Sequence, residues 1–332
     1  MNILIVSDAW HPQVNGVVRT LDTTIGELRK LGHTVTCVGP DRFRTIACPT
    51  YPEIRLAIHA SRGMAKEIAA LNPDAIHIAT EGPLGIAARR YCVKHRMAFT
   101  TAYHTRFPEY VHARVRVPVS LTYRMLRRFH RPSRRIMVAT QSIRDDLTKQ
   151  GFENLCEWSR GVDTELFHPD ATATVEGPGP IWLYVGRVAV EKNIEAFLKL
   201  DLPGTRYVVG DGPLLAELRR KYPDVRFVGM KSGRELAHFY AAADVFVFPS
   251  RTDTFGLVLL EALASGVPVA AYPVPGPRDV INGAAVGCLD EDLQKAAESA
   301  LSVSRETCRD YALTFSWRNC AQQFLDNLVS VR

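Results

Sequence analysis

The sequence predicts an α/β protein made of two doubly wound, parallel-sheet domains. The chain has 332 residues, which corresponds to two domains of ordinary size. Short apolar runs alternate with segments of helical periodicity, and this alternation favours parallel strands that are covered by helices on both faces. The alternation stops once, in a segment at 168–180 that is rich in Pro, Gly and Thr, and then starts again. We interpret that segment as the linker between the domains.

Each half supplies its own set of strands. The strands expected in the first half are residues 2–7, 34–39, 75–79, 98–102 and 135–139. Those expected in the second half are residues 181–185, 206–209, 225–228, 245–249 and 267–271. Helices lie between them, including 233–243 and 255–264, and a last helical stripe is formed by Trp317, Ala321, Phe324 and Leu328.

Composition excludes several classes of protein. Hydrophobic residues make up 46% and charged residues 23%, which is typical of a globular protein with substantial cores. The seven cysteines include no C-x-x-C pair, so we expect scattered thiols in a reducing cytosol. No run of eighteen apolar residues and no basic start of a signal peptide is present, so we expect a cytoplasmic protein.

Positive charge is concentrated in the first half of the chain. Residues 1–165 hold 24 Lys and Arg against 15 Asp and Glu, a net charge of +9, whereas residues 166–332 hold 17 against 20, a net charge of −3. Much of the excess lies between Val111 and Arg135, a stretch that includes Arg114 and contains no acid. Such a field attracts an anionic partner, which is a membrane, a nucleic acid or a phosphorylated substrate.

One predicted helix in this stretch is amphipathic. Leu121, Met125 and Phe129 recur every four residues and form an apolar row. The basic stripe beside it consists of Arg124, Arg127, Arg128 and Arg131. This pattern favours a helix that lies on an anionic bilayer and meets a membrane acceptor. The alternative is a helix that packs by its apolar row and exposes a solvated basic face.

Two motifs of the second half follow predicted strands, where doubly wound sheets bind their ligands. In GRVAVEKN (186–193), Arg187 and Lys192 stand at the start of a helix and suit a diphosphate; the alternative is a solvated surface pair. In SRTDTFGLVLLEALASG (250–266), Asp253 and Glu261 are expected to face the mouth of one binding site, where carboxylates accept hydrogen bonds from ribose or sugar hydroxyls. The alternative is an N-cap aspartate and a surface glutamate.

Two motifs of the first half also follow strands. In YHTRFPEY (103–110), His104 stands at the carboxyl end of a strand; the alternative is a structural histidine. In HPQVNGVV (11–18), Gly16 at the start of a helix lets a ligand approach the backbone.

Other signatures are missing. Gly210-Asp211-Gly212 lacks the third glycine of a dinucleotide fingerprint, and there is no Walker A loop and no His/Cys cluster with zinc spacing. The acids at 290–292 resemble a metal-binding D-x-D, but their place at the start of a helix favours a dipole interaction. We therefore expect no metal.

Taken together, the motifs resemble glycosyltransferase family four, which has the GT-B fold, and within it the mannosyltransferase and glycolipid synthase subgroup. The resemblance covers nearly the whole chain and includes GDGP, FVGMKSGREL, ADVFVFPS and the closing FSW helix. It implies an acceptor-binding domain at 1–168, a nucleotide-sugar-binding domain at 169–314, and a helix at 315–332 that crosses back to the first domain, with a cleft between the domains.

The resemblance also implies roles for individual residues. Arg187 and Lys192 neutralise the diphosphate, Glu261 holds the ribose, and His104 contacts the donor sugar. The residues implied to be catalytic are His104, Arg187, Lys192, Asp253 and Glu261. Those implied to bind the donor are Gly16, Gly186, Met230, Lys231, Thr254, Phe255, Gly256 and Leu257.

The expected reaction is the retaining, metal-independent transfer of a hexosyl unit from UDP- or GDP-hexose. The acceptor expected is a hydroxyl of a membrane lipid, such as diacylglycerol or a glycolipid, at the inner face of the plasma membrane, with no nucleic-acid partner. Other possibilities are a soluble or polysaccharide acceptor, a GT-B epimerase or phosphorylase, a nucleotide-sugar sensor and a nucleic-acid-binding protein.

Overall fold

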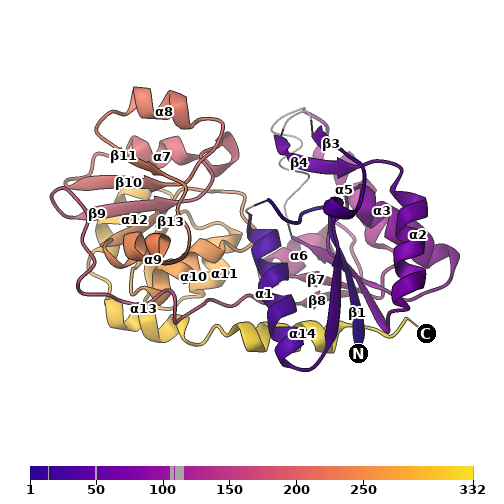
Figure 1. The fold of residues 1–332 in the computed structure, drawn as a ribbon. Coiled ribbons are helices and arrows are strands. Elements are labelled where there is room, and N and C mark those ends of the chain that lie inside the picture. Colours follow the sequence, from indigo (N-terminus) through magenta and orange to yellow (C-terminus); the bar gives the residue numbers. More distant parts are fainter. Residues whose placement is uncertain (14, 49–50, 105–107, 109–115, 332) are drawn as a thin grey trace. The chain divides into compact units, whose positions relative to one another are not determined.

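The computed structural model confirms the predicted fold class. It describes all residues except 14, 49–50, 105–107, 109–115 and 332. The chain divides into two compact units (Figure 1): unit 1 comprises 1–160 and 317–332, and unit 2 comprises 161–316. Each unit contains a six-stranded parallel sheet with helices on its faces.

The sheet of unit 1 has the order β2-β1-β5-β6-β7-β8. Its strands are β1 (Asn2–Val6), β2 (Thr34–Val38), β5 (Ala75–Ile78), β6 (Thr100–Tyr103), β7 (Arg135–Val138) and β8 (Leu155–Glu157). Its helices are α1 (Gly16–Lys30), α2 (Ala60–Leu71), α3 (Pro83–Lys94), α5 (Val119–His130), α6 (Gln141–Lys149) and α14 (Trp317–Asn327), with the short 3-10 helix η1 (Pro40–Arg42). An antiparallel pair that the sequence did not predict, β3 (Thr45–Cys48) and β4 (Tyr51–Ala57), forms a separate small sheet.

The sheet of unit 2 has the order β11-β10-β9-β12-β13-β14. Its strands are β9 (Ile181–Val185), β10 (Thr205–Val209), β11 (Arg226–Gly229), β12 (Val245–Phe248), β13 (Val269–Ala271) and β14 (Gly287–Leu289). Its helices are η2 (Val190–Lys192), α7 (Ile194–Leu198), α8 (Leu215–Lys221), α9 (Gly233–Ala241), α10 (Leu257–Ala264), α11 (Pro275–Ile281), α12 (Leu293–Ala300) and α13 (Arg305–Ala312).

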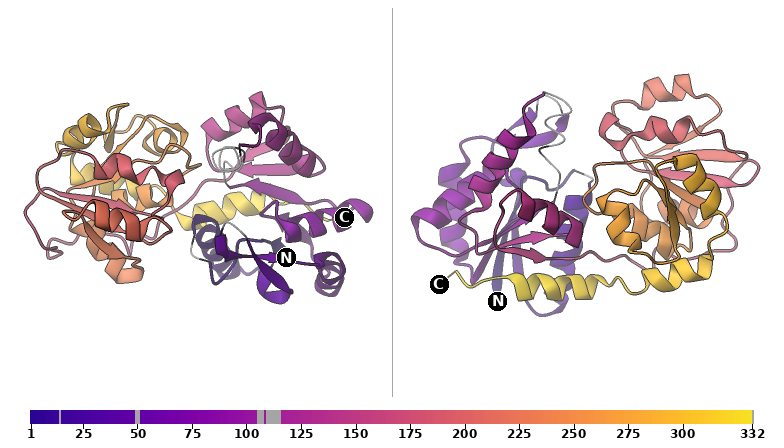
Figure 2. Two further views of the ribbon diagram at one scale, coloured as in Figure 1. Left: turned by 90° about the horizontal axis from the view of Figure 1, so that it is seen from above. Right: turned by 180° about the vertical axis from the view of Figure 1, so that it is seen from behind.

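Both faces of each sheet are buried, as the continuous apolar strands indicate. In β1, Leu4 and Val6 belong to one core, whereas Ile3 and Ile5 belong to another. Successive side chains of a strand point to opposite faces, so these two cores cover the two sides of one sheet. The second of these cores includes Phe324 of α14, which packs beside α1 (Figure 2).

The boundary between the units differs from the expected linker. The segment 161–168 and the Pro/Gly-rich segment 168–180 both belong to unit 2. Arg309 donates hydrogen bonds to the carbonyls of Phe167 and Thr164, and Tyr207 donates its hydroxyl to the carbonyl of Glu176. These bonds tie both segments to the second sheet, so the chain passes between the units at Arg160 and Gly161 and returns at Trp317. Helix α14 therefore belongs to unit 1, and it spans Trp317–Asn327 rather than the whole of the expected 315–332.

Candidate functional site

The sheet of unit 2 reverses its strand order between β9 and β12. From β9 the chain winds outward to β10 and β11, and from β12 it winds the other way to β13 and β14. Ligands of doubly wound sheets bind outside the carboxyl ends of the strands at this reversal. Gly186 and Arg187 follow β9, and Ser250 to Asp253 follow β12. The two motifs predicted from the sequence therefore flank the topological switch point.

An ion pair joins these two loops. The Nζ atom of Lys192 lies 2.5 Å from Oδ1 of Asp253, and both side chains are largely buried. Thr252 donates its hydroxyl to the carbonyl of Glu191, and Asn193 donates its side-chain amide to the carbonyl of Pro249. Three side-chain hydrogen bonds thus hold the η2 turn against the loop after β12, and Asn193 was not singled out in the sequence.

The loop after β9 is supported by a tight glycine turn. A Cβ atom on Gly210, at φ +149°, would lie 1.9 Å from the carbonyl oxygen of Gly186, and one on Gly212 would lie 2.4 Å from that of Val188. The amide of Val188 donates to the carbonyl of Asp211 at 2.9 Å. The G-x-G after β10 therefore lets two loops approach closely, a role that differs from dinucleotide binding.

Asp253 does not cap the helix that follows it. Helix α10 begins at Leu257 rather than at Phe255, because Gly256 precedes it with a left-handed φ of +85°. The N-cap residue is Gly256, which makes no side-chain capping bond, and Oδ1 of Asp253 accepts instead from Lys192. The structure therefore contradicts the N-cap alternative for Asp253. Thr254 and Phe255 lie in the loop before the helix.

Glu261 is a buried carboxylate and not a surface residue. It is only 3% exposed, and its Oε2 accepts a hydrogen bond of 3.0 Å from the hydroxyl of Tyr240 on α9. Burial of a carboxylate is costly unless hydrogen bonds compensate it. The surface-glutamate alternative is therefore wrong. Sequence reasoning missed its partner Tyr240, because a tyrosine that hydrogen-bonds a carboxylate cannot be told in the sequence from any other buried tyrosine on a helix.

Three further residues predicted to bind the donor follow strands β9 and β11. Arg187 is half-buried, and its carbonyl accepts the hydroxyl of Tyr184 at 2.8 Å. Met230, just after β11, is 62% exposed, and Lys231 pairs with Glu235 at 3.6 Å. All of these residues belong to unit 2.

His104 follows β6 in unit 1 and lies against a buried arginine. The Nη2 atom of Arg160 lies 3.3 Å from Nδ1 of His104, and the ring of Trp158 meets the imidazole edge to face. Burial, with the positive charge of Arg160 and the neighbouring His77, lowers the pKa of His104 well below its usual value. Most of the surrounding YHTRFPEY motif (105–107 and 109–110) lies outside the described residues.

The switch point of unit 1 contains a carboxylate that sequence reasoning missed. Asp8 follows β1 and accepts hydrogen bonds from the amides of Leu84 and Gly85 and from the hydroxyl of Thr80. Burial raises its pKa. Asp8 thus caps the first turn of α3, which is a structural use of its charge. Nearby, Gly16 opens α1 as expected, but Asn15 already accepts the amides of Val17 and Val18; Val14 of this loop is not among the described residues.

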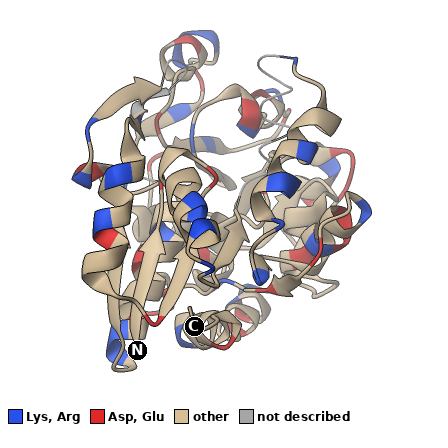
Figure 3. Ribbon diagram, turned by 90° about the vertical axis from the view of Figure 1, so that its right-hand side faces the viewer, with Lys and Arg blue, Asp and Glu red and all other residues tan. Residues whose placement is uncertain are grey.

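The amphipathic helix α5 differs from the predicted pattern. Phe129 is 8% exposed and belongs to a core, whereas Leu121 and Met125 are 47% and 65% exposed. Of the predicted apolar row only Phe129 packs inward, and the helix also packs by Tyr123 and Leu126. The alternative of a packed helix with an exposed basic face therefore holds, but with different packing residues. Arg124, Arg128 and Arg131 are exposed, and exposed Arg127 donates to the carbonyl of Gln150. Basic residues lie on helices of this unit, drawn in blue in Figure 3. Arg114 lies outside the described residues.

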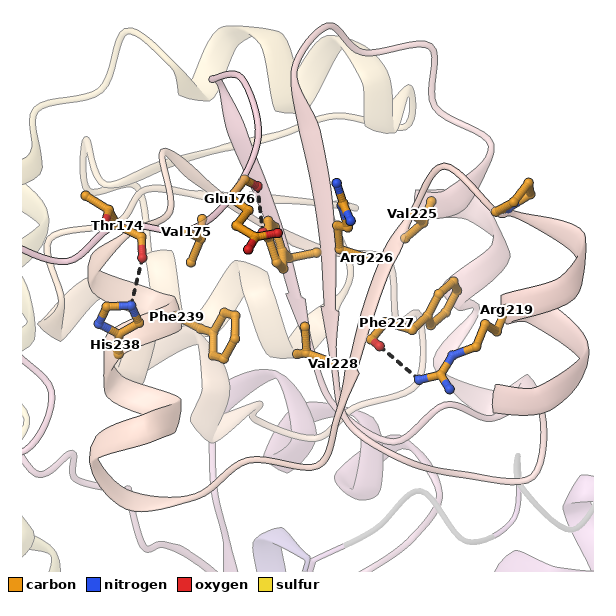
Figure 4. A pocket seen from close by; sticks show the side chains of 12 residues that line it. Thr174, Val175, Glu176, Arg219, Val225, Arg226, Phe227, Val228, His238 and Phe239 are labelled. Carbon is orange, nitrogen blue, oxygen red and sulfur yellow. Dashed lines mark hydrogen bonds between the residues drawn. The ribbon is translucent and has the colours of Figure 1, made fainter.

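A cavity of about 740 Å³ lies at the β11 edge of unit 2 (Figure 4). Its lining includes Tyr207, Phe227 and Phe239, with Arg219 and Arg226. It includes none of the predicted donor-binding residues, so we assign it no part in donor binding.

The structure also tests the acidic motif at 290–292. Asp292 caps α12 by accepting from the amides of Gln294 and Lys295, and Asp290 pairs with Lys295 at 2.9 Å. Within the described ranges, no group of three or more His, Cys, Asp or Glu is placed to hold a metal ion. No helix in that part of the chain is both long and apolar enough to cross a bilayer.

Fold and site define a two-unit α/β protein with the GT-B architecture. Sucrose-phosphate synthase from Thermosynechococcus elongatus superimposes with a TM-score of 0.79 at 20% identity, over 98% of this chain and 97% of the other. The model of Glycosyltransferase Family 4 matches residues 14–166, and that of Glycosyl transferases group 1 matches residues 179–305.

Two curated relatives have similar sequences. A GDP-mannose-dependent alpha-mannosyltransferase of Mycolicibacterium smegmatis is 30% identical, with 87% of this chain and 84% of that protein covered. An alpha-monoglucosyldiacylglycerol synthase of Streptococcus pneumoniae is 27% identical, with 91% and 78% covered. The chain belongs to glycosyltransferase family 4, as the resemblance predicted, and it is a glycosyltransferase that uses a nucleotide-sugar donor.

Proposed function

We propose that the chain transfers a hexosyl unit from a nucleoside-diphosphate sugar to a hydroxyl group of a membrane lipid, with retention of the anomeric configuration and without a metal ion. The bond between the anomeric carbon and the diphosphate oxygen breaks, and a bond between that carbon and the acceptor oxygen forms. The departing phosphate takes the acceptor proton, so the nucleoside diphosphate is the second product. This transition state places growing negative charge on the leaving group.

The placement of Lys192 at the switch point is the observation that carries the proposal. It stands, with Arg187, in the loop after β9, and Asp253 faces it from the loop after β12. A cation at this position stabilises the leaving diphosphate without a metal ion. Glu261 and the backbone after Asp253 supply acceptors and donors for the ribose and for the transferred sugar.

We propose GDP-mannose as the first donor to test. The mannosyltransferase of M. smegmatis, which is GDP-mannose-dependent by name, aligns over most of both chains. UDP-hexoses are the second set, because a base that is contacted through the main chain near Met230 and Lys231 would leave little trace in side-chain identity.

We propose a lipid acceptor at the inner face of the plasma membrane. The S. pneumoniae relative is named for a diacylglycerol product. Unit 1 carries the positive excess, and α5 exposes Leu121 and Met125 among arginines. Exposed apolar side chains flanked by cations suit a peripheral contact with an anionic bilayer.

The test is donor turnover across UDP-, GDP- and ADP-sugars, each in EDTA and with or without anionic vesicles that contain diacylglycerol. Turnover of one donor in EDTA, faster with diacylglycerol, supports the proposal, and the one-bond coupling between C1 and H1 of the transferred sugar shows whether configuration is retained. Turnover with soluble acceptors alone would reject the lipid acceptor. Binding of no sugar nucleotide would reject the assigned donor site.

A further inference from the structure

Arg160 is a buried cation that forms no salt bridge with a carboxylate of the described residues, and its guanidinium group is held in place by its neighbours. It is 5% exposed, and its Nη1 donates to the carbonyls of Trp158 and Ser159 at 2.5 and 2.9 Å. The guanidinium carbon lies 4.5 Å from the centroid of the Trp158 ring. With Nη1 used in this way, the planar group has one orientation, and Nη2 lies 3.3 Å from Nδ1 of His104.

The residues that hold the guanidinium of Arg160, Trp158 and Ser159, are themselves held by α14. Gln323 accepts hydrogen bonds from both the amide and the hydroxyl of Ser159 at 2.9 Å. Phe324 packs against the ring of Trp158 with centroids 4.9 Å apart. The residues on either side of the guanidinium therefore cannot shift without moving this helix.

The direction of the bond to His104 follows from chemistry. A guanidinium has five N–H donors and no acceptor, so the ring nitrogen that faces it must accept. Nδ1 of His104 therefore carries no proton. In a neutral imidazole the single proton then lies on Nε2.

The surroundings keep this imidazole neutral. Burial is the largest cause of its lowered pKa, and among the described residues Arg160 and His77 add to it, since both oppose a positive ring. Burial lowers the pKa of Arg160 to about 10, so the guanidinium stays charged near neutral pH.

We propose that Arg160 is a positioning residue that locks His104 in the Nε2–H tautomer, so that the imidazole donates a hydrogen bond to an oxygen of the transferred sugar. This inference rests on the proposed function and on the family resemblance, which implies that His104 contacts the donor sugar. In this role His104 holds the sugar and exchanges no proton during the reaction. Arg160 acts through His104 and needs no contact with the substrate.

The direct test is the ¹⁵N NMR spectrum of the histidine rings, with the His104 signals identified by their loss in His104→Gln. We expect a pyridine-like Nδ1 and a pyrrole-like Nε2 that stay unchanged from pH 8 to pH 5.5. A proton on Nδ1, or titration of His104 in this range, overturns the inference. This measurement uses the unmodified protein, so it does not depend on the folding of an Arg160 variant.

Variants then test the consequence for catalysis. Arg160→Met removes the donor and the charge, so the Nδ1–H tautomer also becomes populated and we expect about a tenfold loss of kcat/KM at neutral pH. Both nitrogens of the protonated ring carry a proton, so this loss should shrink toward acid, with a midpoint nearer about 6.5. Arg160→Lys keeps a charged donor, so its kcat/KM should again be the same at neutral and at acid pH. Arg62→Met, which removes an exposed arginine of the same unit, is the control.

The double variant distinguishes positioning from a structural role. In a His104→Gln background, Arg160→Met should add no pH dependence, because no imidazole remains to titrate. An equal loss at every pH, with and without His104, shows a structural role and overturns the proposal. If the NMR spectrum shows the Nε2–H tautomer but no sugar nucleotide is turned over, the proposed function is rejected and the inference about the tautomer is kept.

Discussion

Lys192 and Asp253 form an ion pair across the topological switch point of unit 2, with 2.5 Å between Nζ and Oδ1. The family resemblance assigned the lysine to the donor diphosphate, and the aspartate was expected to accept hydrogen bonds from ribose or sugar hydroxyls. Their contact means that the lysine is oriented before a donor arrives, so less side-chain entropy is lost when the donor binds. It also means that the two residues are coupled energetically.

We expect Lys192→Met to lower kcat/KM by about 100-fold, because the leaving diphosphate loses a preorganised cation. The double variant Lys192→Met/Asp253→Asn should regain part of the donor affinity, since Asp253 no longer places an unpaired negative charge beside the diphosphate. Calorimetric titration of the donor with both variants measures this. Lys199→Met, an exposed lysine of the same unit, should behave like the unmodified protein. Equal donor affinity in the single and double variants would argue against the coupling.

The buried pair of Glu261 and Tyr240 gives a second prediction. Glu261→Gln keeps the shape but removes the charge, so we expect about tenfold weaker donor binding, whereas Tyr240→Phe should lower the free energy of unfolding by about 1 kcal/mol. Donor titration and chemical denaturation separate the two effects. The exposed Glu217→Gln is the control for loss of a carboxylate. Unchanged donor affinity in Glu261→Gln would remove Glu261 from the donor site.

Gly210 is predicted to be the least replaceable glycine of the loop after β10. A Cβ atom there would clash with the backbone of Gly186, so Gly210→Ala should lower the free energy of unfolding by about 3 kcal/mol and weaken donor binding. Gly283→Ala has a left-handed φ of +75° but meets no atom within 4 Å, so it isolates the backbone strain at about 1 kcal/mol. Equal losses in the two variants would show that the close approach contributes nothing.

His77 makes the stability of unit 1 depend on pH. Its burial lowers its pKa from 6.5 to about 3. Between these two pH values His77 binds a proton in the unfolded chain but not in the folded unit. The free energy of unfolding is therefore highest above pH 6.5 and falls as the pH drops toward 3. The slope contributed by this group approaches about 1.4 kcal/mol per pH unit. His77→Gln should flatten the dependence of the unfolding midpoint on pH between 6.5 and 4.5, and the exposed His95→Gln should not.

The sequence predicted the parallel sheets well, for a physical reason. Strands such as Ile181–Val185 are buried on both faces, so they appear as continuous apolar runs whose limits are easily seen. The edge strands β8 and β14 and the β3–β4 pair escaped prediction. Such short strands carry little apolar signal, and in β3 only Ile46 is a large aliphatic residue, which is 52% exposed.

The candidate site was predicted in its motifs but not in its partners. Spacing along the chain placed Lys192 and Asp253 after neighbouring strands, because the carboxyl ends of parallel strands share one edge. Spacing does not report which side chains touch across 61 positions, so the ion pair was not predicted. Arg160 was missed for the same reason, since its partner His104 is 56 positions away.

The exposed face of α5 gives the last prediction, on membrane binding. Arg124→Gln/Arg128→Gln removes two exposed cations, each worth about 1 kcal/mol near an anionic surface, so we expect about 30-fold weaker partitioning onto anionic vesicles. Leu121→Gln/Met125→Gln should weaken partitioning onto the same vesicles by removing insertable apolar area, and here the loss should persist in high salt. Arg220→Gln/Arg234→Gln removes two exposed arginines of unit 2 and controls for net charge. Flotation of each variant on vesicles of equal lipid composition measures the partitioning. An equal loss in the control pair would assign the attraction to net charge rather than to this helix.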